Sequence, residues 1–254
     1  MAKKNEMIPG QLVLDLSTDV TNYVVQGNEL VTAKQSLKLN SAKVVRTLIM
    51  QIKPDDTDFK TYHITVDKLS KLLGVSKSNL YRDIQPIIND IEHNWVKFEP
   101  KDASKKAYIE LPWFDVISYD DELGFLVKIS PYLKPYLLNL KNRYTQYQLE
   151  DILKMKSVYA IRLYELLIEK AQDKINSPGG AKVTFSLEEL RRSLNCENKF
   201  ERFSQFREKV IDKAVMEICK CTFYDVVRQF NSPPGTKTYN AVTFHIQSYL
   251  YKPQ

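Results

Sequence analysis

The chain has 254 residues, and at roughly 150 residues per domain this length favours two domains over one. Its 43% hydrophobic and 27% charged residues are ordinary globular usage, which disfavours a wholly disordered chain. The 37 Lys and Arg residues exceed the 31 Asp and Glu residues, and the resulting charge of +6 is compatible with a polyanionic partner without demonstrating one.

Motifs and cysteines narrow the classes of protein further. Only 7 residues are glycine, and neither the GxGxxG nor the GxxxxGK[ST] phosphate-binding motif occurs. No apolar run approaches the roughly 18 residues of a membrane span, and no signal-peptide stretch follows the basic start. The three cysteines are an odd number and the three histidines lie far apart in sequence, which predicts reduced thiols and no metal site. We therefore expect a cytoplasmic protein with no cofactor, no metal and no membrane partner.

The first half of the chain predicts two capped helices followed by strands. Residues 1–30 show weak periodicity and are interpreted as a flexible N-terminal arm. Thr65 is expected to cap a helix that ends at Leu73, with Gly74 in the left-handed position behind it. The other expected elements are a helix over 32–53, a strand over 62–64, a helix capped by Ser76 and running to about His93, strands over 95–98, 107–111 and 125–129, and a polar turn over 101–106.

The second half predicts the same order of elements. Ser186 is expected to cap a helix through Leu194, with Glu189 in the position of a capping box. The other expected elements are a long helix over 147–171, a loop over 177–180, a strand over 183–185, a helix over about 198–220, and strands over 223–227 and 242–248 around a turn at 231–235.

The two halves match at a constant offset of 121 residues. The corresponding residues are Thr65 and Ser186, Lys68 and Glu189, Leu69 and Leu190, and Leu73 and Leu194. Each half has the order of a winged helix, in which the third helix can enter a DNA major groove and a β-hairpin follows. Capped helices at intervals occur in any helical protein, but the shared order favours an α+β, helix-rich fold of two tandem winged-helix domains, over 31–141 and 142–254.

The first helix–turn–helix has polar side chains that are suited to DNA. Leu69 and Leu72 are expected to face the core, and Val75 to fill the gap between the helices. The cap at Ser76 then directs the first turns of the second helix outward. The candidates for phosphate and base-edge contacts are Lys77, Ser78, Asn79, Tyr81 and Arg82. The alternative is a plain helical hairpin with a solvated charged face.

The helix expected over 198–220 has an apolar and a polar face. The apolar residues that fall together are Phe203, Phe206, Val210, Ala214 and Ile218. Opposite them lie side chains that can pair with guanine or adenine edges. With the neighbouring cations and the wing turn, the candidate DNA-binding residues here are Asn198, Lys199, Arg202, Gln205, Arg207, Lys209 and Lys237. The alternative is that an exposed helix face ordinarily carries such residues.

Tyrosine is abundant, with 15 residues, and six of them crowd the segment 132–164. A tyrosine nucleophile would indicate a nicking or recombinase enzyme, which usually also needs a metal cluster or several positioned Arg and His residues. The sequence shows neither pattern. We therefore expect no catalytic residue and interpret these tyrosines as packing residues.

Two strings at the junction of the halves carry a family resemblance. Residues 137–149 read LLNLKNRYTQYQL and residues 153–167 read LKMKSVYAIRLYELL. Both resemble the signature of the iteron-type plasmid replication initiators, the Rep proteins with two winged helices. Residues 206–218, FREKVIDKAVMEI, are similar to the recognition helix of that family, and residues 28–31, NELV, fit the start of its first long helix. The resemblance covers about residues 28–250.

The resemblance implies a function. Such initiators bind directly repeated sites, the iterons, in double-stranded origin DNA, using both winged helices as monomers, with the main base contacts from the C-terminal one. As homodimers, paired through the N-terminal domain, they repress their own gene. They help to open an AT-rich region and recruit the host replicative helicase, often with the host initiator, and they lack nuclease and ATPase activity.

The leading hypothesis is therefore a plasmid replication initiator that is not an enzyme. We expect the C-terminal recognition helix to read bases, and the N-terminal one to contact an adjacent DNA segment mainly through phosphates. Two such modules on one face would protect about 20 base pairs. The alternatives are a sequence-specific transcriptional repressor without a replication role, and a partner-binding protein whose winged helices only dimerise.

Overall fold

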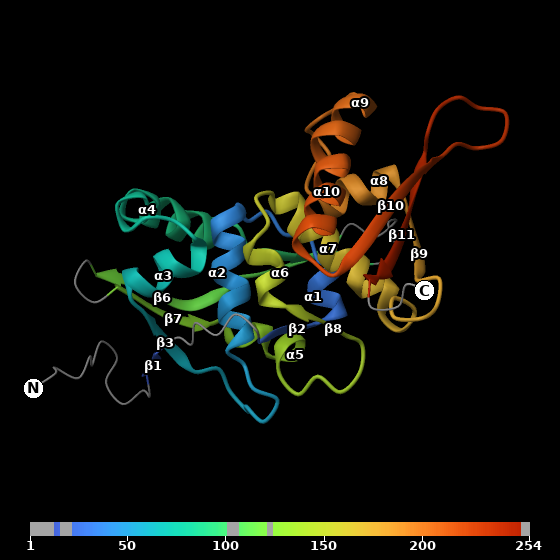
Figure 1. Cartoon of the computed structure of the whole chain (residues 1–254). Helices are drawn as coiled ribbons and strands as arrows, with labels where there is room; N and C mark the ends of the chain where they lie inside the picture. The colour runs from blue at the N-terminus through green and yellow to red at the C-terminus, as the bar shows by residue number, and fades with distance from the viewer. Residues whose placement is uncertain (1–12, 16–21, 101–106, 121–123, 250–254) are drawn as a thin grey trace, which may run out of the picture.

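The computed structural model describes residues 13–15, 22–100, 107–120 and 124–249. Figure 1 shows the first half of the chain in blue to green and the second in yellow to red. The elements of the first half are β1 (Val13–Asp15), β2 (Tyr23–Gly27), α1 (Asn28–Thr32), α2 (Leu39–Met50), β3 (Thr61–Ile64), α3 (Val66–Leu73), α4 (Lys77–His93), β4 (Val96–Phe98), β5 (Ile109–Leu111), β6 (Phe114–Asp120), β7 (Gly124–Ile129), the 3-10 turn η1 (Pro131–Leu133) and α5 (Lys134–Leu137).

The second half begins with the strand that follows the segment 138–143. Its elements are β8 (Tyr144–Gln148), α6 (Leu149–Leu153), α7 (Val158–Ala171), the 3-10 turn η2 (Gln172–Lys174), β9 (Ala181–Ser186), α8 (Leu187–Ser193), α9 (Phe203–Phe206), the π-helical segment η3 (Arg207–Asp212), α10 (Lys213–Cys221), β10 (Tyr224–Asn231) and β11 (Ala241–Ser248). No helix in the described part of the chain is long and apolar enough to cross a membrane.

The first helix–turn–helix, α3 and α4, is confirmed with its caps. The Thr65 hydroxyl accepts the backbone N–H of Lys68 at 3.2 Å, and Gly74 ends α3 at a φ of 66°. The Ser76 hydroxyl accepts the backbone N–H of Asn79 at 3.2 Å at the start of α4. Each cap pairs an N–H that has no partner within its own helix, and so fixes where that helix begins.

The helix expected over 32–53 is wrong in its first part. The chain leaves the helical conformation after Thr32 and resumes it at Leu39. Between them, Lys34 and Lys97 exchange two backbone hydrogen bonds, at 2.9 and 3.0 Å, as an isolated β-bridge. A backbone partner from β4 therefore overrides the local helical periodicity, which reports only the pattern of apolar residues.

The helix expected over 147–171 is also wrong in its first part. Residues up to Gln148 form β8, and the short helix α6 ends before a break at 154–157. At that break the Glu217 carboxylate accepts the backbone N–H groups of Lys156 at 2.8 Å and Ser157 at 3.0 Å. Because α10 supplies partners for these N–H groups, α7 can begin at Val158 as a separate helix.

The interpretation of residues 1–30 as a flexible arm is wrong for residues 13–15, which form β1 and pair parallel with β3, and for residues 23–30. Residues 23–30 form β2 and begin α1, and the side chains of Val24 and Leu30 are fully buried. β2 pairs antiparallel with β8, from Tyr23 opposite Gln148 to Gly27 opposite Tyr144. The periodicity of a strand does not show a partner so far along the chain.

The strands form two main sheets and two separate antiparallel pairs. The four-stranded sheet has the order β1-β3-β7-β6, and the three-stranded sheet has the order β10-β11-β9. The remaining pairs are β2-β8 and β4-β5. The expected strands appear as β3, β4, β5, β7, β9, β10 and β11, whereas β1, β2, β6 and β8 were not predicted from the sequence. The polar turn expected over 101–106 lies outside the described residues.

The 121-residue offset extends beyond the two caps. β2 and α1 span 23–32, and β8 and α6 span 144–153, which is the same range shifted by 121. α3 begins at residue 66 and α8 at residue 187, again 121 apart. The chain therefore contains two copies of the winged-helix order, joined through the β2–β8 pair.

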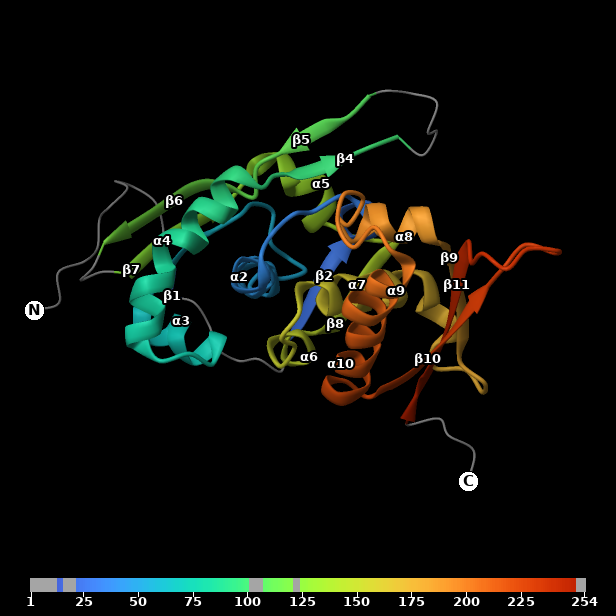
Figure 2. The same ribbon diagram turned by 90° about the horizontal axis from the view of Figure 1, so that it is seen from above.

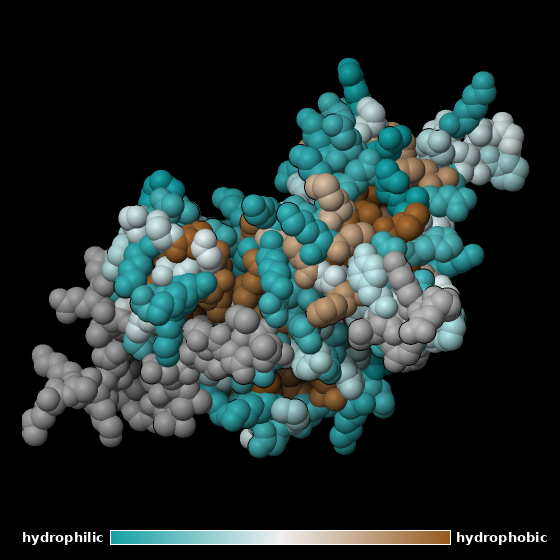
Figure 3. Space-filling view, viewed as in Figure 1, coloured by the Kyte–Doolittle hydropathy of each residue, from teal (hydrophilic) through white to brown (hydrophobic). Residues whose placement is uncertain are grey.

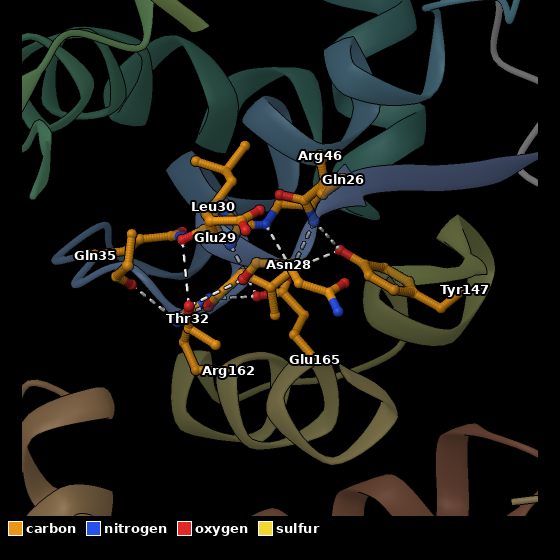
Figure 4. Close-up of polar contacts among 12 residues, drawn as sticks. Gln26, Asn28, Glu29, Leu30, Thr32, Gln35, Arg46, Tyr147, Arg162 and Glu165 are labelled. Atoms are coloured by element: carbon orange, nitrogen blue, oxygen red, sulfur yellow. Dashed lines mark hydrogen bonds and ion pairs between the residues drawn. The ribbon is translucent and has the colours of Figure 1, made fainter. Parts of the chain in front are cut away.

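A buried cluster of charged side chains packs the two copies together (Figure 4). The Glu165 carboxylate accepts hydrogen bonds from Arg46 at 2.9 and 3.0 Å, from Arg162 at 2.7 Å and from the Tyr147 hydroxyl at 2.5 Å. Arg162 also donates to the backbone oxygen of Val31 at 2.8 Å. Burial raises the pKa of Glu165, but the two guanidinium groups outweigh it and lower this pKa to about 2.

Candidate nucleic-acid interface

The N-terminal end of α4 exposes every candidate residue of the first helix–turn–helix. The exposed side chains are those of Lys77, Ser78, Asn79, Tyr81 and Arg82. Tyr81 is a large aromatic side chain that is 52% exposed. The interpretation of this segment as a polar, outward-facing surface is therefore confirmed, while its contact with DNA stays a prediction.

Carboxylates accompany the cations of this surface. Asp67 accepts from Lys71 and from Lys77, each at 2.8 Å. These two ammonium groups lower the pKa of Asp67 to about 2. Arg82 lies beside Asp83, with 3.3 Å between its Nε and the carboxylate. The free protein thus presents this surface with part of its positive charge already paired, so its net field is weaker than a count of cations indicates.

The second helix–turn–helix has a longer turn than the first. The helix expected to begin at Asn198 begins at Phe203, so Asn198 and Lys199 lie in the turn and not on the helix. Within the turn, Asn195 and Phe200 have φ values of 53° and 54°. Two non-glycine residues in the left-handed region reverse the chain there, which delays the helix by five residues relative to α4 shifted by 121.

Arg191, on α8, fixes the shape of this turn. Its guanidinium donates to the backbone oxygen of Lys199 at 3.0 Å and to that of Phe200 at 2.9 Å. It also lies over the ring of Phe206, at 4.1 Å from the ring centroid. The side chain therefore links the turn to the recognition helix. Sequence reasoning missed Arg191 because it looks like an ordinary cation in the last turn of a helix.

The recognition helix, α9 with η3 and α10, buries one face as predicted. The side chains of Phe206, Val210, Ala214 and Ile218 are completely buried, and the expected core face is confirmed for these four. Phe203 is only half-buried. Ile211 is also completely buried and was not expected there, because the π-helical segment η3 turns two consecutive residues inward.

The polar candidates on this helix lie in solvent. Gln205, Arg207 and Lys209 are exposed, and Arg202 is exposed at the N-cap position of α9. The turn residues Asn198 and Lys199 are exposed as well. The structure thus brings six of the seven candidates of this module, all except Lys237, to the start of one helix, where four of them flank its first turns.

An aromatic cluster joins the start of the recognition helix to the wing. The ring of Phe203 lies 5.2 Å from that of Phe230 on β10 and 5.1 Å from that of Tyr239. In Figure 1 the β10–β11 loop projects beyond the body of the protein beside α9. Lys237, in this loop, is exposed as expected. Because the aromatic rings pack on both elements, wing and helix are expected to meet DNA in a fixed relation.

Asp212 holds two arginines between the helix and the wing. Its carboxylate accepts from Arg207 at 3.4 Å and pairs with Arg228 of β10. Arg228 was not among the candidates, because a strand residue carries no helical pattern. The guanidinium of Arg207 is thereby turned toward the wing side of the helix.

The two candidate surfaces, at the starts of α4 and α9, lie on one side of the molecule. In Figure 1, α4 and α9 both form its upper side, and the view from above shows α2 end-on between α4 and α10 (Figure 2).

Within the described part of the chain, no group of three or more His, Cys, Asp and Glu side chains comes together as a metal site. Tyr147 and Tyr164 are buried, which confirms the packing role expected of them, whereas Tyr132 and Tyr144 are 67% and 39% exposed and contradict it.

Two family sequence models match the chain. The one described as Initiator Replication protein, WH1, matches residues 23–168, and the one described as Initiator Rep protein, WH2, matches residues 186–232. The two matches include α3 and α4 in the first case and α8, α9 and α10 in the second. Each candidate helix–turn–helix therefore falls inside a winged-helix domain of the family.

Known proteins resemble the chain over most of its length. An Escherichia coli protein described as an uncharacterized 27.6 kDa protein is 25% identical over 207 residues, 77% of this chain and 84% of that protein. The PI protein of Escherichia coli is 30% identical over 165 residues, which span 60% of this chain and about half (52%) of the relative. The crystal structure of the Pi initiator protein in complex with iteron DNA matches with a TM-score of 0.72 and 20% identity, over 90% of this chain and 98% of that one. This last likeness shows the same fold.

Proposed function

This chain belongs to the family of initiator replication proteins with two winged-helix domains, and we propose that it initiates plasmid replication by binding repeated sites in double-stranded origin DNA. The observation that carries the proposal is the pair of exposed polar surfaces at the starts of α4 and α9, on one side of the molecule. The relative of known structure was crystallised with iteron DNA, which supports the same class of ligand here.

The two modules divide the work in this proposal. The module over 142–254 reads bases through Arg202, Gln205 and Lys209 and makes the main contacts with each repeat. The module over 31–141 contacts the adjacent segment, more through phosphates, and also mediates dimerisation. The dimer represses the protein's own gene, and the DNA-bound monomer helps to open the origin and recruits the host replicative helicase together with the host initiator.

The protein acts in the cytoplasm and catalyses no reaction itself in this proposal. Incubating supercoiled origin DNA with the protein and Mg²⁺ tests the second point. A covalent adduct between a tyrosine and a DNA end would overturn the non-enzymatic assignment, whereas unchanged supercoiled DNA would support it.

Footprinting tests the proposal as a whole. The DNA that flanks the gene is labelled, mixed with increasing amounts of protein and then cleaved, so that bound segments are protected from cleavage. We expect protection of directly repeated segments of about 20 base pairs each, since each module covers about one helical turn. Binding should weaken steeply as salt rises, because the phosphates release their counterions on binding. Protection of unrelated DNA at the same protein concentrations would contradict sequence-specific binding.

Deleting the gene separates initiation from repression alone. If the replicon no longer replicates, the result supports a role of the protein in initiation. Replication that is restored by a second copy of the gene then shows that the loss was due to the missing protein. If the replicon persists and only transcription from its promoter rises, the protein is a repressor without a replication role.

A further inference from the structure

A groove lies on the side of the molecule opposite the two candidate surfaces. It consists of two adjoining hollows of about 860 and 540 Å³ that share β8 as a common wall. In Figure 1 this region, where α2 ends and α5 and β8 lie, is at the lower side of the molecule, while α4 and α9 are at the upper side. We name it the β8 groove, and both hollows contain Lys141, Tyr144 and Gln146 in their lining.

The charge of the β8 groove has one sign. Its lining contains the cations Lys53, Lys141 and Arg143. Among the described residues that line the two hollows there is no Asp or Glu, although the whole chain has 31 of them. All three cations are exposed. Asp56 lies beside Lys53 and accepts its backbone N–H at 2.8 Å, so the positive potential of the groove is strongest at Lys141 and Arg143, where it attracts an anionic partner.

The floor of the groove is apolar. The aliphatic side chains that line the larger hollow are Val25, Met50, Ile52, Leu137 and Leu140. Figure 3 shows a brown, hydrophobic patch at the lower edge of the molecule, over the region where α2 ends and α5 lies. The rings of Tyr23 and Tyr144 are 49% and 39% exposed beside it. Apolar surface in a hollow with a polar rim is typical of a site that receives side chains of another protein.

The backbone holds the cationic segment in an unusual conformation. Asn139 and Arg143 have φ values of 54° and 57°, in the left-handed region that non-glycine residues rarely occupy. The Arg143 carbonyl accepts the backbone N–H of Asn28 at 2.9 Å, and the Tyr144 carbonyl accepts from Gln172 at 2.8 Å. Backbone strain of this kind concentrates at functional sites.

We propose that the β8 groove docks an acidic segment of a partner protein that also carries aliphatic side chains. The carboxylates of that segment pair with Lys141, Arg143 and Lys53, and its aliphatic side chains cover the apolar floor. A single strand of nucleic acid fits less well, because it carries a charge on every nucleotide and the groove offers three cations. Since the groove faces away from α4 and α9, DNA and this segment can be bound at the same time.

Fluorescence anisotropy tests the proposal on the full chain. The probe is a labelled helical peptide of about 15 residues, with Leu on one face and Glu on the other. Its counterpart has Lys in place of every Glu, and an oligothymidylate of similar length represents single-stranded DNA. We expect the acidic peptide to bind and the two other probes to bind at least about ten-fold more weakly, since only the acidic peptide complements both the charge and the floor.

Charge reversal locates the site. The double variant K141E/R143E, and separately Lys53→Glu, should weaken binding of the acidic peptide by about ten-fold or more. The matched control is K182E/K220E, which changes the net charge equally at two exposed lysines outside the groove. The control should stay within about two-fold of the parent protein, because distant charges are screened by salt.

Three results would overturn the proposal: no binding of the acidic peptide, an equal loss in K182E/K220E, or preferred binding of the oligothymidylate. Binding of origin DNA is measured on the same variants, and the groove variants should retain it within about two-fold, since the groove lies away from the candidate surfaces. Failure of the groove and failure of the proposed DNA-binding function therefore give different patterns. Retained DNA binding also shows that the groove variants are folded.

Discussion

Val25 and Gln146 pair at the centre of the β2–β8 ladder, and they are 121 residues apart in the chain. Because this is also the offset between the two winged helices, β2 and β8 are equivalent strands that pair with each other. The next equivalent pair, Gln26 and Tyr147, is joined as well, by a hydrogen bond of 3.0 Å from the amide to the hydroxyl. The two modules therefore meet through equivalent segments related by a local two-fold relation.

Replacing Glu165 by glutamine should destabilise the whole protein. The change leaves the buried guanidinium groups of Arg46 and Arg162 without their counter-charge. Breaking a buried ion pair in this way costs about 3–5 kcal/mol of unfolding free energy. Urea unfolding followed by circular dichroism measures the loss, and the control Glu188→Gln, whose side chain is 89% exposed, should change stability by less than about 1 kcal/mol. Equal effects of the two variants would contradict the role of the cluster.

Arg191→Ala should weaken DNA binding without any contact between Arg191 and DNA. Without the guanidinium, the turn before α9 loses the donor that joins its carbonyls, so binding must order the turn again. The expected loss is about 1–2 kcal/mol of binding free energy. Arg191→Lys should not restore it, because lysine keeps the charge but lacks the planar fork.

The adjacent Arg192 provides a matched control for that experiment. Its side chain is 46% exposed and lies 3.7 Å from Glu188, so Arg192→Ala removes the same charge from the same helix. Binding by the Arg192 variant should match the parent protein, as titrated with labelled repeat DNA. If both alanine variants, or neither of them, lose affinity, Arg191 does not act by positioning the turn.

Arg202→Ala should reduce both affinity and sequence specificity. A base-reading arginine contributes about 1–3 kcal/mol of discrimination, and its removal relaxes the preference at one position of the site. Competition between repeat DNA and random DNA measures this preference. Lys237→Ala, in the wing, should instead weaken binding to both DNAs alike and lower the salt dependence by about one ion. A uniform loss in the Arg202 variant would assign Arg202 to the phosphates.

Much of the fold follows from local chemistry. The hydroxyls of Thr65 and Ser186, the left-handed Gly74 and the apolar face from Phe206 to Ile218 fix caps, turn and core within a few neighbouring residues, and the structure confirms them. What the sequence could not show depends on distant partners. For example, the chain is not helical over 33–38 because Lys34 forms backbone hydrogen bonds with Lys97 of β4.

The candidate site divides in the same way. That its polar residues are exposed follows from amphipathic spacing, and the structure confirms it. The residue at which the recognition helix begins could not be predicted from this spacing. It depends on a turn with Asn195 and Phe200 in the left-handed region and on the hydrogen bonds of Arg191. The roles of Asp212 and Arg228 likewise depend on the packing of a strand beside a helix.

Asp151 predicts a dependence of stability on pH. It is buried and accepts the Tyr164 hydroxyl at 2.7 Å, and burial raises its pKa from 3.8 to about 6. The folded state thus favours the protonated carboxyl. The stability that this group contributes is complete below pH 3.8 and is lost as the pH rises through about 6.

Asp151→Asn removes this dependence. The quantity to compare is the unfolding free energy of the variant minus that of the parent protein. This difference should be about 2–3 kcal/mol larger at pH 7.5 than at pH 4, because asparagine does not ionise. Urea unfolding at the two pH values measures the difference. The control Asp115→Asn, at an exposed site, should show no such change. A difference of the same size in the control would refute the assignment to Asp151.

The pairing of β2 with β8 also bears on how the protein is made. A ribosome releases β2 long before it has synthesised its partner, and Val24 has no strand to cover it until Tyr147 has emerged. Contacts of such sequence separation form slowly. The N-terminal module therefore depends for its completion on the beginning of its own duplicate, and nascent chains that stop at the module boundary are the ones that chaperones and proteases are expected to meet.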